Sequence, residues 1–313
     1  MKKLVVCFLV FASLITANAN AQDRFIKYDF MKVLPGQDFV KLETAWANYH
    51  RELVNAGFIQ MHRVWKVLPS QDVDYDYITS TVYNSYKDAV GLGKNPVTAE
   101  MIKAKYPEAY EIAQTSSKVR TSVRSYIQKI DFAIWDSTYT VTPKKSIMKI
   151  EYVKSKNSQY KAAEIAFSSK FHQFRLDNKL LKTFTISTLM GSATDSYHSH
   201  FISSGFADID QAIAPLDSKK INFTPAELKK IDELIAMRDI KKVVLFVNVI
   251  NTQKDNSLTA NEDINSSSVS NNAENNNSNS NQNNQNQKIM DQDMFGDGDL
   301  SLADGEREID NYL

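Results

Sequence analysis

The sequence predicts an α+β fold: two consecutive copies of one strand–helix–strand–strand–helix–strand unit, followed by a disordered tail. Three observations support this prediction. The pattern of Ile26–Leu68, a strand, a helix and a second strand, returns at Ile147–Met190. His172 follows His50 by 122 positions (172 − 50) within these two segments. From Asn251 the composition changes abruptly to Asn, Ser and Gln, which have almost no apolar surface to bury.

The first 21 residues have the composition of a secretory signal peptide. Lysines precede an apolar run at Leu4–Ala17, and the small residues Ala19 and Ala21 mark a cleavage point. Cys7, the only cysteine, lies inside this run, so we expect an exported chain without thiols. Disulfides, cysteine-bound zinc and cysteine nucleophiles are thereby excluded. We expect a periplasmic or secreted protein.

Charge and hydropathy argue against two kinds of partner. The formal net charge is +0, from 37 Lys and Arg against 37 Asp and Glu, and the basic residues form no stripe. We therefore expect no nucleic-acid partner. After the signal peptide no apolar run reaches the roughly 20 residues of a membrane-spanning helix, so we expect no transmembrane segment in the mature chain.

The first repeat is expected over residues 22–136 and starts with a strand at Ile26–Leu34. A helix follows, because apolar residues recur at steps of three and four between Gln37 and Gly57, a residue type that commonly ends helices. This apolar stripe consists of Phe39, Leu42, Trp46, Tyr49 and Leu53. A second strand is expected at Phe58–Leu68.

Two further strands complete this repeat. The third is expected at Tyr75–Asn84, where β-branched and aromatic residues alternate. A helical region is expected over Thr98–Val119, and Pro107 restarts it at a first turn, where a missing N–H costs little. The fourth strand is expected at Thr121–Trp135.

The second repeat is expected over residues 147–250, after a linker at 137–146. Thr224 and Glu227 have the spacing of a helix N-terminal capping box. The expected elements are strand Ile147–Lys154, helix Ser158–Asn178, strands Leu180–Met190 and Tyr197–Phe206, a helix from Thr224, and strand Ile240–Ile250.

In this order of elements, the segment Phe25–Ile250 resembles the dimeric α/β-barrel group of ferredoxin-like proteins, which includes small monooxygenase-type and stress-responsive members. Members of that group pair two such units so that their sheets face each other. The resemblance implies two tandem ferredoxin-like β-α-β-β-α-β repeats packed as a pseudo-dimeric α/β barrel within one chain.

The two helix histidines allow two interpretations. His50 and His172 match at an offset of 122, but the apolar stripes align at 121, as Trp46 and Phe167 do (167 − 46). One residue rotates a helix side chain by about 100°. The two histidines therefore either form an equivalent pair or lie separately at core edges with local hydrogen bonds.

The third strand of each repeat suggests a ligand pocket. His198 and His200 are two apart, so both rings should leave one face of a strand together with Phe206. At an offset of 123 (198 − 75) the first repeat has aromatic residues. If this face lines the space between the sheets, it forms an apolar pocket for a small apolar or aromatic molecule. The candidate pocket residues are Tyr75, Tyr77, Tyr83, His198, His200, Phe206, His62, His50 and His172.

The same histidines open an enzymatic alternative. His198 and His200, with His62 or His172 brought near by folding, are residue types that bind a metal or haem iron. No Asp or Glu lies in register beside the pair. A cofactor-free oxygenase is implied by the family resemblance, and the sequence identifies no catalytic residue for it. Gly-rich phosphate loops and Gly-x-Ser-x-Gly motifs are absent from the sequence.

The tail divides into a disordered linker at 251–287 and an acidic segment at 288–313. Its stretch DMFGDGDLSLAD, at 293–304, resembles an EF-hand or dockerin calcium loop. Phe295 replaces an oxygen ligand, and the last ligand is Asp rather than Glu, which predicts modest affinity. The alternative is a soluble acidic tail. The candidate calcium ligands are Asp293, Asp297, Asp299, Ser301 and Asp304.

These patterns lead to a preferred hypothesis and an alternative. The preferred one is an exported small-molecule-binding or interaction protein with weak calcium binding in its tail. The alternative is an oxygenase-type or haem- or metal-dependent enzyme that uses the histidines of the pocket between the sheets. The sequence leaves the cofactor open, with calcium in the tail as one candidate, and it leaves the ligand, the reaction and the oligomeric state open as well.

Overall fold

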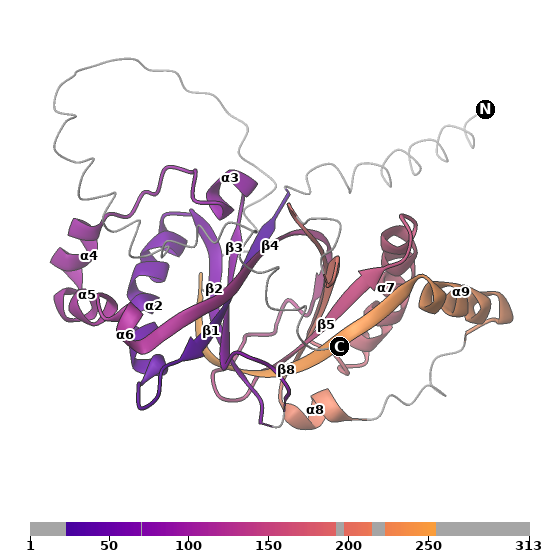
Figure 1. Ribbon diagram of the computed structural model, residues 1–313. Helices are drawn as coiled ribbons and strands as arrows, with labels where there is room; N and C mark the ends of the chain where they lie inside the picture. The colour runs from indigo at the N-terminus through magenta and orange to yellow at the C-terminus, as the bar shows by residue number, and fades with distance from the viewer. Residues whose placement is uncertain (1–22, 70, 192–196, 215–222, 255–313) are drawn as a thin grey trace, which may run out of the picture.

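A closed, antiparallel barrel of eight strands forms the centre of the molecule. The computed structural model describes residues 23–69, 71–191, 197–214 and 223–254. Around the barrel the strand order is β1-β3-β2-β8-β5-β7-β6-β4, and β4 returns to β1. Eight helices lie outside the barrel in the described part of the chain (Figure 1). The expected α+β class is therefore confirmed.

The first half of the barrel contains β1 to β4. Its helix α2 begins after Asp38, whose side chain accepts a hydrogen bond from the Lys41 N–H, and Gly57 follows the helix with φ of +70°. Pro107 stands at the start of α5, as expected. The elements are β1 (Phe25–Val33), α2 (Phe39–Asn55), β2 (Ile59–Val67), β3 (Tyr77–Tyr83), α3 (Tyr86–Ala89), α4 (Ala99–Lys105), α5 (Pro107–Ala113), α6 (Ser116–Val119) and β4 (Arg120–Trp135).

The second half contains β5 to β8. The capping box predicted at Thr224 and Glu227 is present at the start of α9. The last strand extends to Gln253, beyond the expected end at Ile250. The elements are β5 (Ile147–Ser155), α7 (Tyr160–Asp177), β6 (Thr183–Leu189), β7 (His200–Phe206), α8 (Ile209–Ile213), α9 (Pro225–Ala236) and β8 (Arg238–Gln253).

Two long strands join the halves. β4 pairs with β1 along residues 120–129 and with β6 along 128–135. β8 pairs with β5 along 238–247 and with β2 along 246–253. Because each strand changes partner midway, the two sheets are hydrogen-bonded into one barrel without a free edge.

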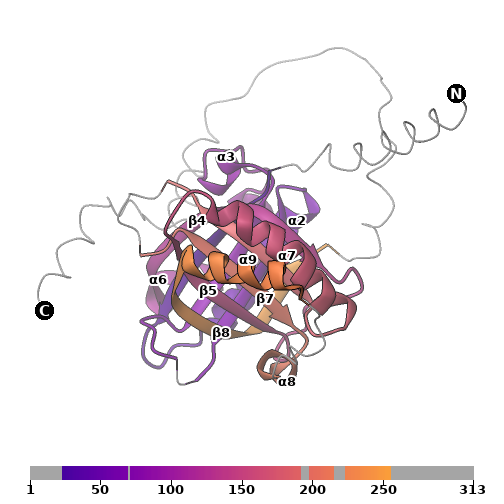
Figure 2. The same cartoon turned by 90° about the vertical axis from the view of Figure 1, so that its right-hand side faces the viewer.

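The apolar side chains form three layers. An inner core fills the barrel and includes Tyr28, Phe30, Trp65, Phe201 and Phe246. The first helix layer packs α2 and its neighbouring helices against the first half, and the second helix layer packs α7 and α9 against the second. Figure 2 shows α7 and α9 side by side across the strands of the second half.

Some sequence predictions need adjustment or lie outside the described residues. The helical region at 98–119 consists of three short helices, α4 to α6. Within the described residues, no helix is long and apolar enough to cross a membrane. The predicted signal peptide, most of the polar linker and the calcium loop at 293–304 lie outside the described part of the chain.

Candidate functional site

The third strands do not present one shared face to the barrel interior. β7 begins at His200, which lies on the helix side with Tyr160, at a ring distance of 5.1 Å. His198 precedes the strand and stacks on Phe201 in the inner core, with ring centroids 4.5 Å apart. The expectation that His198 and His200 leave the same face is therefore wrong, because side-chain alternation holds only within the regular strand.

The first half divides its pocket candidates in the same way. Tyr75 precedes β3 and belongs to the inner core, whereas Tyr77 and Tyr83 belong to the first helix layer. In the second half, Phe206 belongs to the second helix layer. Most of the predicted pocket face is thus covered by helices, contrary to the expected pocket between the sheets.

The rings that do reach the barrel interior pack against one another. The Tyr75 and Tyr152 hydroxyls are hydrogen-bonded at 3.0 Å, and the Phe30 and Tyr75 rings are 4.8 Å apart. His198 is also in edge contact with Tyr126 at 4.8 Å. At the predicted position the structure therefore has a packed aromatic core rather than a ligand pocket.

The two helix histidines occupy similar surroundings. His50 stacks on His62 with ring centroids 3.5 Å apart, and His172 stacks on Phe184 at 3.7 Å. His62 and Phe184 are themselves 122 positions apart (184 − 62) on β2 and β6. The two stacks thus match at an offset of 122, although only the first partner is an imidazole, whereas the buried carboxylates Glu43 and Glu164 of the same helices match at 121 (164 − 43).

His50 belongs to a group of polar residues between α2 and the sheet, which we call the α2 polar cluster: Glu43, His50, His62 and Arg120. Glu43 is 2% exposed, and its Oε1 is 3.3 Å from Nε of Arg120, the first residue of β4. His62 Nδ1 is hydrogen-bonded to the Thr81 hydroxyl at 2.8 Å. Within the described residues the buried His62 Nε2 lacks a hydrogen bond, and Glu43 Oε1 and Arg120 Nε contact each other only as an ion pair.

Burial and the Arg120 charge determine the protonation of this cluster. Burial lowers the pKa of His62 to about 3, and Arg120 adds to the effect. Burial also lowers the pKa of His50, with contributions from His62 and Arg120. The pKa of Glu43 is raised by burial, whereas Arg120 acts to lower it. Both imidazoles are therefore neutral at neutral pH.

The second helix layer has a corresponding group with complete hydrogen bonding at its carboxylate. Glu164 Oε2 is 2.6 Å from Arg238 Nη1, and Glu164 Oε1 accepts from the Ser168 hydroxyl at 3.1 Å. His172 Nδ1 is 3.3 Å from Arg175 Nη1. Unlike the α2 polar cluster, this group has a carboxylate with both oxygens bound, as expected of a structural ion pair.

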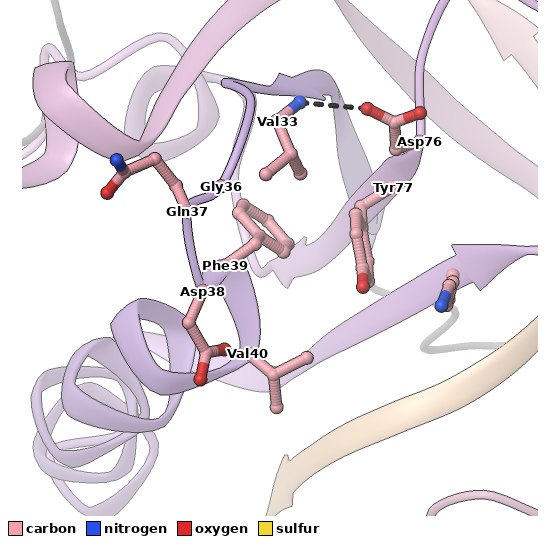
Figure 3. A pocket seen from close by; sticks show the side chains of 9 residues that line it. Val33, Gly36, Gln37, Asp38, Phe39, Val40, Asp76 and Tyr77 are labelled. Carbon is pink, nitrogen blue, oxygen red and sulfur yellow. Dashed lines mark hydrogen bonds between the residues drawn. The ribbon is translucent and has the colours of Figure 1, made fainter.

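A surface pocket of about 440 Å³ lies at the N-terminal end of α2 (Figure 3). Phe39 and Tyr77 form its aromatic wall, with ring centroids 4.3 Å apart. Lys66 contributes a cation 6.0 Å from the Tyr77 ring centre. Asp76 accepts a hydrogen bond from the Val33 N–H at 2.9 Å. The residues of the α2 polar cluster do not line this pocket; Glu43 lies four residues after Phe39, about one turn further along α2.

Sequence reasoning missed several of these residues. Glu43 lies in the apolar stripe of its helix, four residues after Phe39 and three before Trp46, and Glu164 repeats a buried carboxylate in α7. A charged residue in such a stripe was the available signal. The arginine partners begin β4 and β8, and no local pattern connects them to the helices.

The histidines do not fit a haem or transition-metal site. In the described residues no three His, Cys, Asp or Glu side chains gather as metal ligands. The helix histidines lie flat against other rings, and His198 and His200 point to opposite sides of the sheet. A haem would have to displace these packed rings.

Comparisons place this chain beside barrel proteins of several activities. It matches no known family model, and no curated protein sequence is significantly similar to it. It is similar to the structure of a candidate monooxygenase from Lactobacillus acidophilus NCFM, with 12% identity, a TM-score of 0.47, and 74% of this chain and 96% of that chain covered. An anthrone oxidase-like protein has 10% identity and a TM-score of 0.45, with 75% and 94% covered. A haem-binding protein from Thermus thermophilus has 11% identity and a TM-score of 0.42, with 73% and 92% covered.

Our preferred sequence interpretation, a small-molecule-binding or interaction protein with a pocket between the sheets, is corrected by the structure. The aromatic and histidine-lined pocket on which it depended is packed core.

Proposed function

We propose that the chain is an oxygenase-type enzyme for a small aromatic molecule with an acidic hydroxyl, and that the α2 polar cluster is its acid–base centre. The observation that carries this proposal is His62 Nε2, a buried imidazole nitrogen without a hydrogen bond in the described residues, in the same layer as the buried Glu43–Arg120 ion pair. Native proteins leave few such atoms without a partner, and a functional role is one reason for them. The pocket at the start of α2, one helical turn before Glu43, has the size and aromatic wall of a small-molecule site.

In this proposal His62 and Arg120 act on the substrate hydroxyl. His62 Nε2 accepts its proton, while the Thr81 hydroxyl on Nδ1 holds the ring. The Arg120 guanidinium stabilises the resulting anion. An anion in the cluster would offset the Arg120 charge and raise the low pKa of His62, so proton transfer is coupled to binding. The deprotonated, electron-rich ring is the species that reacts with oxygen.

Oxygen uptake tests this function. Purified protein is mixed with anthrone, a naphthoquinol or catechol in an oxygen electrode. We expect uptake above a serum-albumin control for one of these phenol-type probes, and a fall of about 10²–10⁴-fold in H62N, the usual contribution of general acid–base catalysis. The matched control is H172N, which removes an imidazole from the second helix layer. Equal loss in both variants, or no uptake above the control, would contradict the proposal.

We further propose that the barrel is a duplicated unit fused into one chain. Supporting this, β4 and β8 each have 16 residues and each change partner between the halves. Glu43 and Glu164 each stand four residues after the first residue of their helix, and their arginine partners each begin a long strand. Since the barrel closes within one chain, light scattering should give the mass of a monomer; an obligate dimer would argue against this proposal.

Two proposals concern the segments outside the described residues. We propose export, from the pattern of the first 21 residues, and modest calcium binding at 293–304, from the spacing of its acidic residues. Calorimetric titration of a peptide covering 288–313 tests the second proposal. Absence of heat and of helix gain at millimolar calcium would remove it.

A further inference from the structure

Arg63 carries a positive charge into the barrel without a carboxylate partner. It lies on β2 between Met61 and Trp65, whose side chains pack in or against the inner core. Its Nε donates to Asn251 Oδ1 at 3.0 Å, and its Nη2 donates to Gln253 Oε1 at 2.6 Å. Both acceptors are neutral amides. Among the described residues, no carboxylate pairs with Arg63 and its Nη1 makes no hydrogen bond.

The surroundings of Arg63 contain hydroxyl groups rather than acids. Tyr28 and Arg63 both face Ser80 of β3, so the three form a row across neighbouring strands. Tyr28 is 2% exposed, and its hydroxyl is 3.4 Å from that of Ser203. The segment between the halves covers this side, because Asn251 donates to the Val141 carbonyl at 3.2 Å.

Arg63 differs from Arg120 and Arg238 in having no carboxylate partner for its guanidinium among the described residues. Arg120 and Arg238 each have a carboxylate within the helix layers, whereas the buried Arg175 contacts His172 and two phenylalanine rings instead. Burial lowers the pKa of the Arg63 guanidinium to about 10. At the position 122 residues on (185 − 63), β6 has the uncharged Thr185. The barrel frame therefore does not require a charge at this position. A partly buried charge without a counter-charge costs free energy, so its presence at Arg63 needs another explanation.

We propose that Arg63 is the anchor of an anion site at this end of the barrel, for a small carboxylate or the carboxylate end of a longer molecule. The guanidinium offers its Nη1–Nη2 edge, since Nε and one N–H of Nη2 are already engaged by the two amides. Paired N–H groups match the two oxygens of a carboxylate, which makes this class a better partner than a spherical halide. The site does not depend on the reaction proposed for the α2 polar cluster.

Thermal unfolding of the full-length protein tests this site. Sodium formate, acetate and chloride are compared at equal ionic strength and neutral pH. Formate or acetate at about 100 times its Kd is expected to raise Tm by roughly 5–10 °C over chloride. R63M should lose this shift, whereas the matched control R51M, on the exposed surface of α2, should keep it.

Three outcomes would overturn the proposal. In the first, formate and acetate raise the Tm of R63M and R51M equally, and in the second they leave the Tm of the wild-type protein unchanged. In the third, chloride raises the Tm of the wild-type protein as much as the carboxylates do, and R63M loses that rise. If R63M does not fold, the comparison of melting temperatures is replaced by saturation-transfer NMR of the wild-type protein with formate. Saturation transfer that acetate competes away supports the site, and absence of transfer overturns it.

Discussion

The Glu164→Gln substitution separates a structural ion pair from the α2 polar cluster. Glu164 is 2% exposed, and Arg238 Nη1 lies 2.6 Å from its carboxylate. Removing one partner of a buried ion pair costs about 3–5 kcal/mol, because the remaining charge loses its counter-charge. Glutamine can still accept from Ser168, and the Arg238 side chain is 18% exposed, so the lower end applies. We expect a loss of about 3 kcal/mol.

The matched variant is Glu43→Gln. Glu43 is equally buried, but its 3.3 Å contact with Arg120 lacks hydrogen-bond geometry at Oε1 and Nε. Removing a weakly formed interaction costs less, and we expect about 1 kcal/mol. For a domain of this size, 1 kcal/mol corresponds to about 2–4 °C in Tm, so E164Q should melt about 6–12 °C below wild type and E43Q about 2–4 °C below.

Urea unfolding followed by circular dichroism measures both losses. The slope of the free energy of unfolding against urea should stay constant, which shows that a midpoint shift reports stability. Oxygen uptake provides the second measurement: E164Q should keep the activity of wild type, corrected for its folded fraction, and E43Q should lose it. Equal destabilisation by the two substitutions would refute the structural distinction between the clusters.

Three further predictions follow from buried groups and local geometry. Five imidazoles have pKa values lowered below the unfolded value of about 6.5, so the unfolded chain binds more protons as pH falls. The stability present above pH 6.5 should therefore decrease by roughly 1.4 kcal/mol per imidazole at pH 5.5; urea titration measures this loss, and a flat profile would contradict it. Burial lowers the pKa of His62 to about 3, that of His172 to about 2, those of His198 and His200 to about 4, and that of His50 well below its usual value. Gly205→Ala should cost about 1–3 kcal/mol because a Cβ would meet the Thr183 hydroxyl, and Thr183→Ala in the same chain should restore most of the loss. Asp38→Ala should cost about 1 kcal/mol by removing the α2 cap, and an unchanged Tm would show that the cap contributes nothing.

Much of the local structure follows from sequence pattern. The helix stop at Gly57, the restart at Pro107 and the capping box at Thr224 and Glu227 were all predictable, since each depends on a few neighbouring residues. The order of strands and helices was predictable for the same reason, because alternation and helical periodicity are local.

The candidate site was only partly predictable. His50 and His62 were named from the sequence, but their stacking depends on the placement of α2 over β2. Arg120 was missed because its partner Glu43 lies far from it in the chain and meets it only through packing.

The side of the sheet that each ring faces depends on barrel closure. Pleating alternates faces within a strand, but it does not say where the strand begins or which face the helices cover. His198 and His200 were assigned to one face, and the start of β7 at His200 separates them. The closed barrel encloses a packed core, and the buried polar groups lie outside it, between α2 and the sheet. Sequence could not predict this division, because long-range strand pairing determines which surfaces are enclosed.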